Sequence, residues 1–247
     1  MPAISVLSWN AFGGNITALA NAIAGLNIDF TVIQEANNNA GHAWYNPLNA
    51  LVGYTVVGGI RENVGRNTPG GNLMAPEPNL VRSYAYVYRN ATIAAVNHTL
   101  VNYVTDGAFV VPNSAFNASQ QGYNLRPPLR IDFTHNGNAV YFYTWHAPIG
   151  HTNTRGLTLF DGCQTLQTDV NTNDLVIIGA DTNTVNINNY FNAFAGVQDH
   201  YDVVIAANTA GAGVVDTRTT GITLPQIGLL NALYVNPHWA VPAIVNY

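Results

Sequence analysis

A carboxylate and a carboxamide stand two residues apart at the end of an apolar run in segment 175–183, Leu-Val-Ile-Ile-Gly-Ala-Asp-Thr-Asn. The run is short, rich in β-branched residues and bounded by polar ones, which predicts a buried strand. Residues i and i+2 of an extended segment point the same way, so Asp181 and Asn183 are expected to face one spot and to grip a phosphate, a metal ion or a water. The alternative is an Asx turn after a strand, where both residue types are common.

Three other expected strands also end in a side chain that can do chemistry. Ile4–Asn10 ends in an amide, Asp29–Glu35 in a carboxylate and Ala139–His146 in an imidazole. Because a polar residue recurs where each buried strand ends, we expect a site gathered from several strand ends along one edge.

The elements that must position these residues predict an α+β fold, a β-sandwich with helices packed outside it. Thr17–Ala24 has helical spacing of apolar residues, and residues 156–170 carry a weaker helical pattern. Asn136-Gly137 is a strong signal for a hairpin between segments 126–133 and 139–146. No repeat or linker divides the chain, so we expect one domain over residues 1–247. We further expect a hairpin of 84–89 with 92–97, a Gly-, Asn- and Pro-rich loop over 53–80, and strands over 102–111, 201–206 and 239–245.

The composition excludes several classes of protein. The 247 residues are 48% hydrophobic and 9% charged, yet no apolar run reaches the length of a membrane span. The single cysteine, Cys163, excludes an intrachain disulfide and a cysteine-based metal cage. The net charge of −5 is unlike the diffuse basic footprint of a nucleic-acid binder. The first residues lead straight into a strand-like segment, so no secretory signal is expected.

All eight cations are arginine, and the chain contains no lysine. Arginine suits bidentate contacts with phosphate, but eight residues spread over the chain do not make a patch. One hypothesis is that lysine is absent because the protein is a secreted or translocated toxin that avoids ubiquitination in a host cell. The other is a simple compositional bias.

The order of the motifs resembles the endonuclease/exonuclease/phosphatase superfamily. That family has strands ending in W-N, in Q-E and in His, then G-D-x-N, a Y-D strand and a terminal S-D-H. The resemblance covers nearly the whole chain and implies a four-layer α/β-sandwich, deoxyribonuclease I-like, with two mainly antiparallel sheets flanked by helices. The matching residues are Trp9-Asn10, Gln34-Glu35, Arg126-Pro127, Trp145-His146-Ala147, Asp181-Thr182-Asn183, Tyr201-Asp202 and His238.

The resemblance implies a Mg²⁺-dependent phosphodiesterase. Glu35, with Asn10 nearby, would hold the Mg²⁺, which prefers oxygen ligands and offsets negative charge on a phosphoryl group. Asp181 and Asn183 would position the phosphate or the attacking water. Arg126 would bind the non-bridging oxygens.

Two histidines complete the implied site. His238 would be the general base that activates water, and Asp202 would set its tautomer. His146 would sit opposite, donating to the phosphate or helping to protonate the leaving group. Either histidine could instead be a structural residue, and Asp202 could be a strand-start residue.

The last motif departs from the family, because Asn236-Pro237-His238 stands where the family has S-D-H. Proline offers neither a side-chain ligand nor an N–H. Glu35 would then carry more of the metal alone, which predicts weaker Mg²⁺ binding or a degenerate enzyme.

Two branches of the superfamily look closest. Segments 139–148 and 201–206 are similar to deoxyribonuclease I, whereas Arg126 and Arg82 look more like the nuclease of cytolethal distending toxin. The first branch has a Glu that orients the first catalytic His where this chain has Arg82, which favours the toxin branch.

The first hypothesis is therefore a DNA-nicking endonuclease of the toxin type, with a delivery subunit as its partner. The second is a phosphoinositide or sphingomyelin phosphoesterase, because duplex affinity comes largely from neutralising phosphates and this chain has few cations. The third is a catalytically degenerate binding subunit, which Pro237 motivates.

Overall fold

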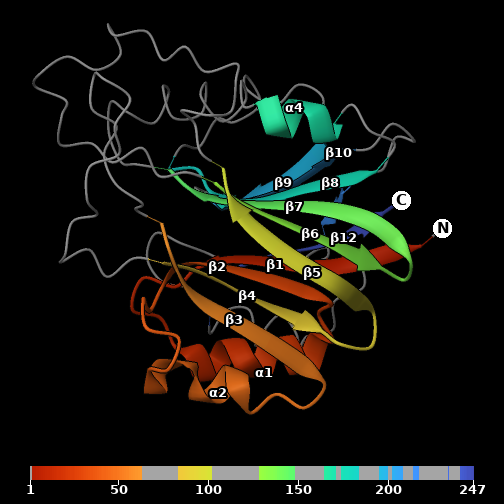
Figure 1. Cartoon of the computed structure of the whole chain (residues 1–247). Helices are drawn as coiled ribbons and strands as arrows, with labels where there is room; N and C mark the ends of the chain where they lie inside the picture. Colours follow the sequence, from red (N-terminus) through yellow and green to blue (C-terminus); the bar gives the residue numbers. More distant parts are fainter. Residues whose placement is uncertain are drawn as a thin grey trace, which may run out of the picture.

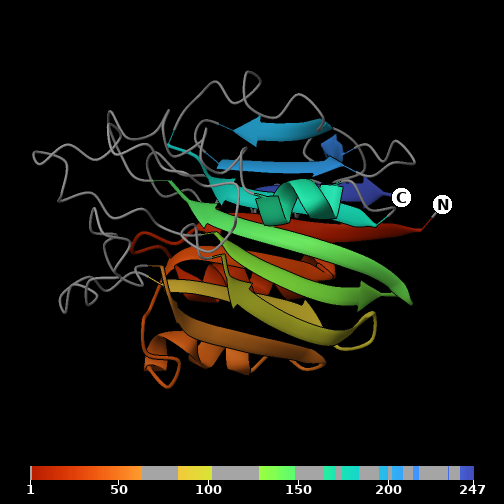
Figure 2. The same cartoon turned by 45° about the horizontal axis from the view of Figure 1, so that its top comes forward.

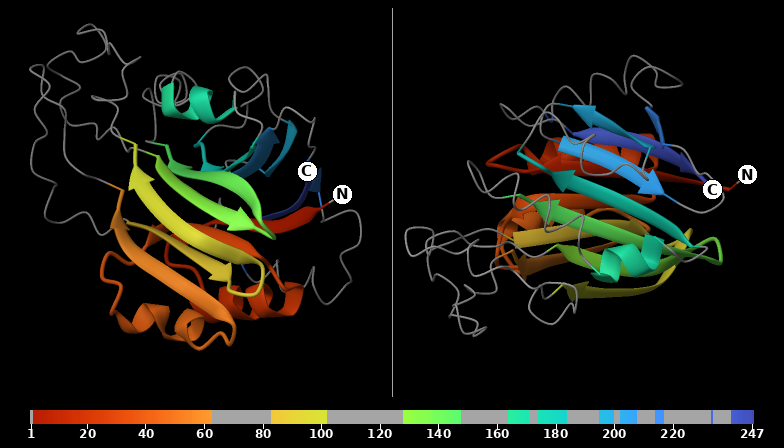
Figure 3. Two further views of the ribbon diagram at one scale, coloured as in Figure 1. Left: turned by 45° about the vertical axis from the view of Figure 1, so that its right-hand side comes forward. Right: turned by 90° about the horizontal axis from the view of Figure 1, so that it is seen from above.

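Two six-stranded sheets stack face to face in the computed structural model of the chain (Figure 1). The chain's two ends lie side by side at one end of the stack, where the Tyr247 N–H donates to the Pro2 carbonyl over 3.1 Å (Figures 2 and 3). The structure describes residues 2–62, 83–101, 128–147, 164–170, 174–183, 195–199, 202–207, 214–216, 233 and 240–247.

The first sheet has the strand order β11-β12-β1-β2-β4-β3. Strands β1 and β2 run parallel, and the other neighbours are antiparallel. Its strands are β1 (Ala3–Asn10), β2 (Phe30–Ala36), β3 (Tyr54–Arg61), β4 (Ser83–Arg89), β11 (Val214–Asp216) and β12 (Val241–Asn246).

The second sheet has the order β5-β6-β7-β8-β10-β9. Here β7 and β8 are the parallel pair, so each sheet contains one parallel pair near its middle. Its strands are β5 (Ile93–Leu100), β6 (Leu129–His135), β7 (Asn138–His146), β8 (Leu175–Asp181), β9 (Ala195–Asp199) and β10 (Asp202–Ala207).

Helices cover the outer face of each sheet, so the sandwich has four layers, as the sequence predicted (Figures 1 and 3). The helix α1 (Ile16–Leu26) and the short α2 (Asn46–Asn49) lie on the first sheet, and α4 (Gln164–Val170) lies on the second. The Asn15 side chain caps α1 by accepting from the Thr17 and Ala18 N–H groups. No described helix is long and apolar enough to cross a membrane.

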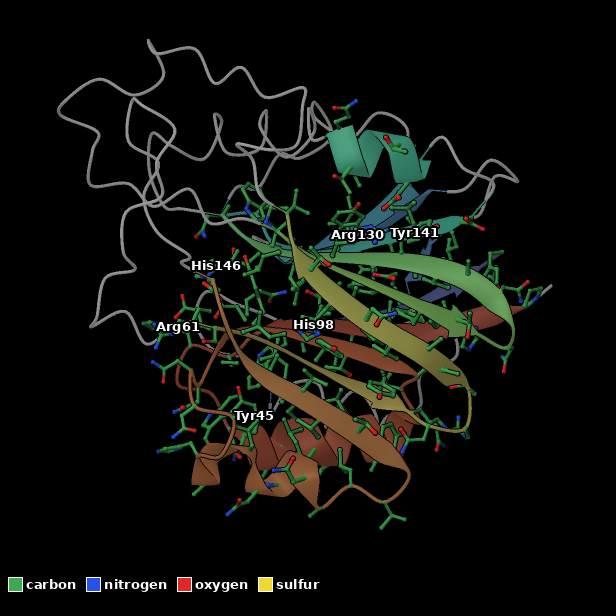
Figure 4. The ribbon with its side chains drawn as sticks, in the orientation of Figure 1. Tyr45, Arg61, His98, Arg130, Tyr141 and His146 are labelled. Atoms are coloured by element: carbon green, nitrogen blue, oxygen red, sulfur yellow. The ribbon has the colours of Figure 1, made fainter. Side chains whose placement is uncertain are left out.

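The main apolar core fills the space between the sheets. Strand β2 contributes Phe30 and Val32, and β7 contributes Phe142, whose ring centroid lies 4.9 Å from that of Phe30. Outside this core, Arg130 on β6 clamps α4 by donating from Nε to Asp169 over 2.7 Å (Figure 4). Apolar burial therefore holds the two sheets together and the helices on them, and an ion pair adds to the packing of α4.

Two expectations about the strands were wrong. Residues 54–61 of the expected loop form strand β3. The two glycines that suggested a loop are accommodated as a bulge within the strand. The expected hairpin of 84–89 with 92–97 does not form, since β4 and β5 belong to different sheets. The Thr92 hydroxyl donates to Asp29 and its carbonyl accepts from the Asn136 N–H, so the chain leaves the first sheet at this turn.

The other expected hairpin is confirmed. Strands β6 and β7 pair in register from Leu129 opposite Thr144 to His135 opposite Asn138. Asn136 and Gly137 connect them with φ of 49° and 85°, the left-handed pair that a tight two-residue turn requires. The expected strand over 102–111 lies outside the described residues.

Candidate active site

Four strands from the two sheets bring polar side chains to one end of the sandwich, opposite the chain termini (Figure 4). In the first sheet Asn10 at the end of β1 lies in register with Gln34, one residue before Glu35. In the second sheet His146 at the end of β7 lies in register with Asp181 at the end of β8. Because each pair of strands is parallel, both members of each pair end at the same edge, as expected.

His146 stands between three carboxylates. Its Nδ1 lies 2.8 Å from Glu62 Oε2, and its Nε2 lies 3.3 Å from Glu35 Oε1 and 3.5 Å from Asp181 Oδ2. The imidazole is 1% exposed, and its backbone N–H donates to the Tyr84 hydroxyl over 3.1 Å. A ring held on both nitrogens and at its backbone has one orientation, with Nε2 turned to the two carboxylates at the strand ends.

Glu62 is the site residue that the sequence patterns did not predict. It follows strand β3 directly, is fully buried, and accepts the Glu35 backbone N–H at Oε1 over 2.8 Å while Oε2 meets His146. This position was expected in a loop, and the orienting group was expected near Arg82. A carboxylate that orients the histidine is thus present in this chain, at Glu62. The absence of such a group was the reason for favouring the toxin branch over the deoxyribonuclease branch, and that reason no longer holds.

A bulge in β3 aims Glu62 at the site. The β3–β4 register shifts between Val57 and Ile60, across Gly58 and Gly59. A Cβ on Gly58 would lie 2.5 Å from the Tyr45 ring, so only glycine lets that ring pack here. The Tyr45 hydroxyl accepts from the Gly59 N–H and donates to the Asn37 carbonyl, and burial raises the pKa of Tyr45 to about 12. A run of apolar residues interrupted by Gly-Gly was the signal for this strand.

Glu35 occupies an unfavourable backbone conformation. Its φ is 53°, which non-glycine residues rarely adopt, and the β2–β4 pairing shifts register between Ile33 and Ala36. Such a conformation persists only where the surroundings enforce it, and it recurs at functional sites. Here it turns the carboxylate of a buried strand toward His146 on the other sheet.

Asp181 and Asn183 are both at the site, but their relation differs from the expectation. Strand β8 ends at Asp181, and Asn183 has a φ of 49°, so the two residues are not on one extended segment. Asp181 Oδ1 accepts from the Asn183 N–H over 2.9 Å, which is the Asx turn kept as the alternative. The Asn183 amide donates to the Ala147 carbonyl over 2.6 Å and ties the end of β8 to that of β7.

Asn10 holds Asp181 across the two sheets. Its amide nitrogen donates to Asp181 Oδ2 over 2.7 Å, and its oxygen accepts from the Phe12 N–H over 3.0 Å. Both contacts are with groups of the protein, and together they set which end of the amide faces Asp181. A role for Asn10 as a metal ligand or in substrate binding stays a prediction.

The remaining predicted residues are only partly covered by the structure. Asp202 begins β10 directly opposite Asp181 in the antiparallel register, so its backbone lies at this end of the sandwich. Arg126 and His238 lie outside the described residues, as do Arg82 and Pro237. The pairing of His146 with a second imidazole therefore stays a prediction.

The donor set suits a divalent cation. Oxygens of Glu35 and Asp181 both approach Nε2 of His146, so two anionic oxygens converge on one spot. Mg²⁺ keeps several of its waters and is held by one or two carboxylates, so this pair fits it. In the part of the chain that the structure describes, no group of three or more His, Cys, Asp or Glu side chains could hold a metal. A protein cage such as zinc prefers is therefore absent there.

The sequence matches no family model and no curated relative. The fold is similar to that of solved structures over nearly the whole chain. D. rerio TDP2 complexed with a single-strand DNA product has a TM-score of 0.61 at 14% identity, covering 100% of both chains. An endonuclease/exonuclease/phosphatase family protein from Bacteroides thetaiotaomicron has 0.57 at 13%, covering 99% of this chain and 95% of that one. A mannosyl-6-phosphatase of the same organism has 0.56 at 13%, covering 98% of each. The chain thus has the deoxyribonuclease I-like fold of this superfamily.

Proposed function

We propose that the chain is a divalent-cation-dependent phosphodiesterase whose site lies where β1, β2, β7 and β8 end. The observation that carries the proposal is His146, oriented by Glu62 at Nδ1 and facing Glu35 and Asp181 at Nε2. A positioned imidazole beside a pair of cation-binding oxygens is what hydrolysis of a phosphodiester requires.

Glu35 would hold the cation, with Asp181 beside it. When bound, Mg²⁺ would offset the negative charge that builds on the phosphoryl oxygens. The protein's own part is to keep the two carboxylates in place: Glu62 accepts the Glu35 N–H, and Asn10 donates to Asp181. Both supports are buried, so the carboxylates keep their positions without a bound ion.

His146 would donate a proton from Nε2 to a phosphoryl oxygen or to the leaving oxygen. The Glu62 carboxylate at Nδ1 sets the orientation of the ring, so that Nε2 faces the site. In the same proposal His238 takes the proton from the attacking water, with Asp202 setting its tautomer. Asp181 and Asn183 position the phosphate or the water, and Arg126 binds non-bridging oxygens.

DNA nicking of the toxin type is the more specific hypothesis, and fewer observations support it than support phosphodiester hydrolysis in general. Among the described cations, Arg89 lies 3.8 Å from Asp29 and Arg130 is bound to Asp169, while Arg61 is exposed at the end of β3 beside Glu62 (Figure 4). Tight duplex binding needs several free cations along the site. A nicking activity on DNA therefore depends on arginines beyond these, such as Arg126, and a small phosphoester such as an inositol lipid headgroup is the alternative substrate.

The test is a substrate panel with Mg²⁺ and with EDTA. Supercoiled plasmid, phosphoinositides and sphingomyelin are offered to the wild type and to His146→Ala and His238→Ala. The proposal expects Mg²⁺-dependent cleavage of at least one substrate that falls by about a hundredfold or more in each variant. The substrate that is cleaved decides between DNA and a lipid headgroup. Equal background in all three proteins contradicts the proposal and favours a degenerate binding subunit.

A further inference from the structure

The proposed site is divided between two sheets that meet through an apolar core. Glu35 lies in the first sheet and Glu62 directly follows its strand β3, whereas His146 and Asp181 lie in the second sheet. Apolar burial is non-directional. The core therefore fixes the distance between the sheets more firmly than it fixes how far one sheet is shifted along the other. Polar contacts that cross the core are needed to set the position of one half of the site against the other.

One buried amide crosses the core directly below the site. Gln34 is fully buried on β2, on the same face as Phe30 and Val32 of the central core. Its Nε2 donates to Thr144 Oγ1 over 2.8 Å and to the Gly179 carbonyl over 3.2 Å in the second sheet, and lies 3.2 Å from Ser8 Oγ in its own sheet. Its contacts therefore join β2 to β1, β7 and β8, which are the four strands that end at the site.

The two contacts in the second sheet are placed one pleat below the site. Thr144 and Gly179 are register partners in the β7–β8 pair, and His146 and Asp181 are the partners two residues further along. Glu35 follows Gln34 directly on β2. The amide of Gln34 thus contacts the Thr144–Gly179 pair of the second sheet. The carboxylate of the next residue, Glu35, faces the His146–Asp181 pair, two residues further along.

Gly179 allows this close approach. A Cβ at position 179 would lie 2.9 Å from Val32 Cγ2 and 3.0 Å from Phe142 Cζ. The missing side chain lets β8 come near enough to β2 for its carbonyl to accept from Gln34. This explains why a glycine interrupts an otherwise apolar strand.

The amide of Gln34 is only partly paired, since its nitrogen has three acceptors and its oxygen has no donor in the part of the chain that the structure describes. Its Oε1 is buried and has no hydrogen-bond partner among the described residues. A buried carbonyl oxygen without a donor costs stability, which offsets part of what the three contacts of Nε2 contribute. The net stabilisation from Gln34 is therefore expected to be small, and its contacts matter mainly for the relative position of the two sheets.

We propose that Gln34 is a positioning residue that holds Glu35 of the first sheet in place against His146 and Asp181 of the second. It touches neither the substrate nor the cation, and it acts through the residue that follows it. The proposal rests on the proposed function for what the positioning serves. The positioning itself is a property of the folded chain and can be measured without activity.

The test compares Gln34→Met with Thr31→Val. Methionine keeps the size of the side chain and removes both donors. Thr31 is a matched control, because it lies on the same strand, is fully buried, and has an Oγ1 without a partner among the described residues. The readouts are the melting temperature, the imidazole nitrogen resonances of His146, assigned with His146→Gln, and kcat on whichever phosphoester the wild type cleaves.

The proposal expects Gln34→Met to fold with a modestly lower melting temperature, because the buried Gly179 carbonyl loses a donor, to shift the His146 resonances, and to lower kcat by about tenfold or more. Thr31→Val should match the wild type in its His146 resonances and in kcat. Thr144→Val removes one of the three contacts of Gln34, so it should shift the same resonances by a smaller amount. Adding Thr144→Val to Gln34→Met should change nothing further, since the Gln34 substitution already removes that contact. Wild-type His146 resonances in folded Gln34→Met, or in Thr144→Val if Gln34→Met does not fold, overturn the proposal. If the wild type cleaves nothing, the proposed function fails while the resonances still decide the role of Gln34.

Discussion

Among single residues, the pair of Glu62 and His146 matters most for the proposed chemistry. Both side chains are 1% exposed, and the carboxylate meets the ring nitrogen over 2.8 Å. A buried carboxylate is costly unless it is paired, and Glu62 is paired twice, with the imidazole and with the Glu35 N–H. Since Glu62 contacts two of the proposed site residues, its charge is expected to matter more for activity than for folding.

Glu62→Gln tests this at one atom. The amide keeps the size of the side chain but loses the charge that faces the His146 ring at Nδ1, so we expect kcat to fall by about a hundredfold. The measurement is kcat of folded protein on the substrate that the wild type cleaves. Asp132→Asn, which alters a carboxylate on Arg130 of the second sheet, should leave kcat unchanged. A wild-type kcat in Glu62→Gln would show that the pair has no role in the chemistry.

A second histidine, His135, predicts how stability depends on pH. It is 1% exposed, lies 3.8 Å from Asp29 and is bonded to the Tyr247 hydroxyl over 2.6 Å. Burial lowers the pKa of His135 below its ordinary value of 6.5, although Asp29 opposes the shift. Because the unfolded chain takes up this proton more readily, the contribution of His135 is fully present above about pH 6.5 and is lost as the pH falls through the folded-state pKa.

Urea unfolding at about pH 5 and about pH 8 measures this contribution. The free energy of unfolding of the wild type should fall toward the lower pH, and His135→Gln should show a smaller fall. His98→Gln removes an exposed ring and should keep the wild-type dependence. If His135→Gln also keeps it, the buried ring is not responsible for the loss of stability in acid.

At the level of the strands and helices, the sequence predicts strands whose burial is continuous and whose ends carry polar residues. Asn10, Glu35, His146 and Asp181 were placed at strand ends for this reason, and all four meet there. Strand β3 was not predicted, because the Gly58-Gly59 pair is typical of a loop. In the structure the space above Gly58 is filled by an aromatic ring, which the sequence does not show. That ring belongs to Tyr45, which is distant in sequence, so local patterns could not reveal the bulge or the role of Glu62.

The missed change of sheet between β4 and β5 has a similar cause. A short polar turn between two apolar segments is typical of a hairpin. What separates the strands is a set of distant partners, since Thr92 bonds to Asp29 and to Asn136. Long-range hydrogen bonds of this kind produce no periodic pattern in the sequence, so they could not be predicted from it.

The bulge makes a prediction of its own. Gly58→Ala places a Cβ 2.5 Å from the Tyr45 ring, and overpacking of this kind costs about 1–3 kcal/mol of unfolding free energy. Because the bulge aims Glu62, activity should fall beyond what the loss of folded protein explains. Gly41→Ala meets only an ordinary contact of 3.5 Å with Asn39, and its effect should stay within about 0.5 kcal/mol. Chemical denaturation and kcat on folded protein distinguish the two variants, and equal stability of both would show that Tyr45 yields without cost.

In the molecule as a whole, the two ends of the sandwich have different tasks. The chain termini, His135 and Asp29 lie at one end, where the partly buried bond between His135 and Tyr247 joins the two sheets. His146 lies at the other end, where each sheet supplies half of the proposed site (Figure 4). The proposed function requires these two halves to surround one divalent cation.

Paramagnetic broadening by Mn²⁺, used in place of Mg²⁺, measures whether a cation binds between the two halves. The imidazole resonances of His146 and His135 are followed in one spectrum as Mn²⁺ is added, so the histidine at the far end serves as the internal control. We expect the His146 signals to broaden first and Glu35→Gln to abolish the effect while leaving the fold intact. Equal broadening of both rings, or His146 broadening that persists in Glu35→Gln, would contradict a shared cation site.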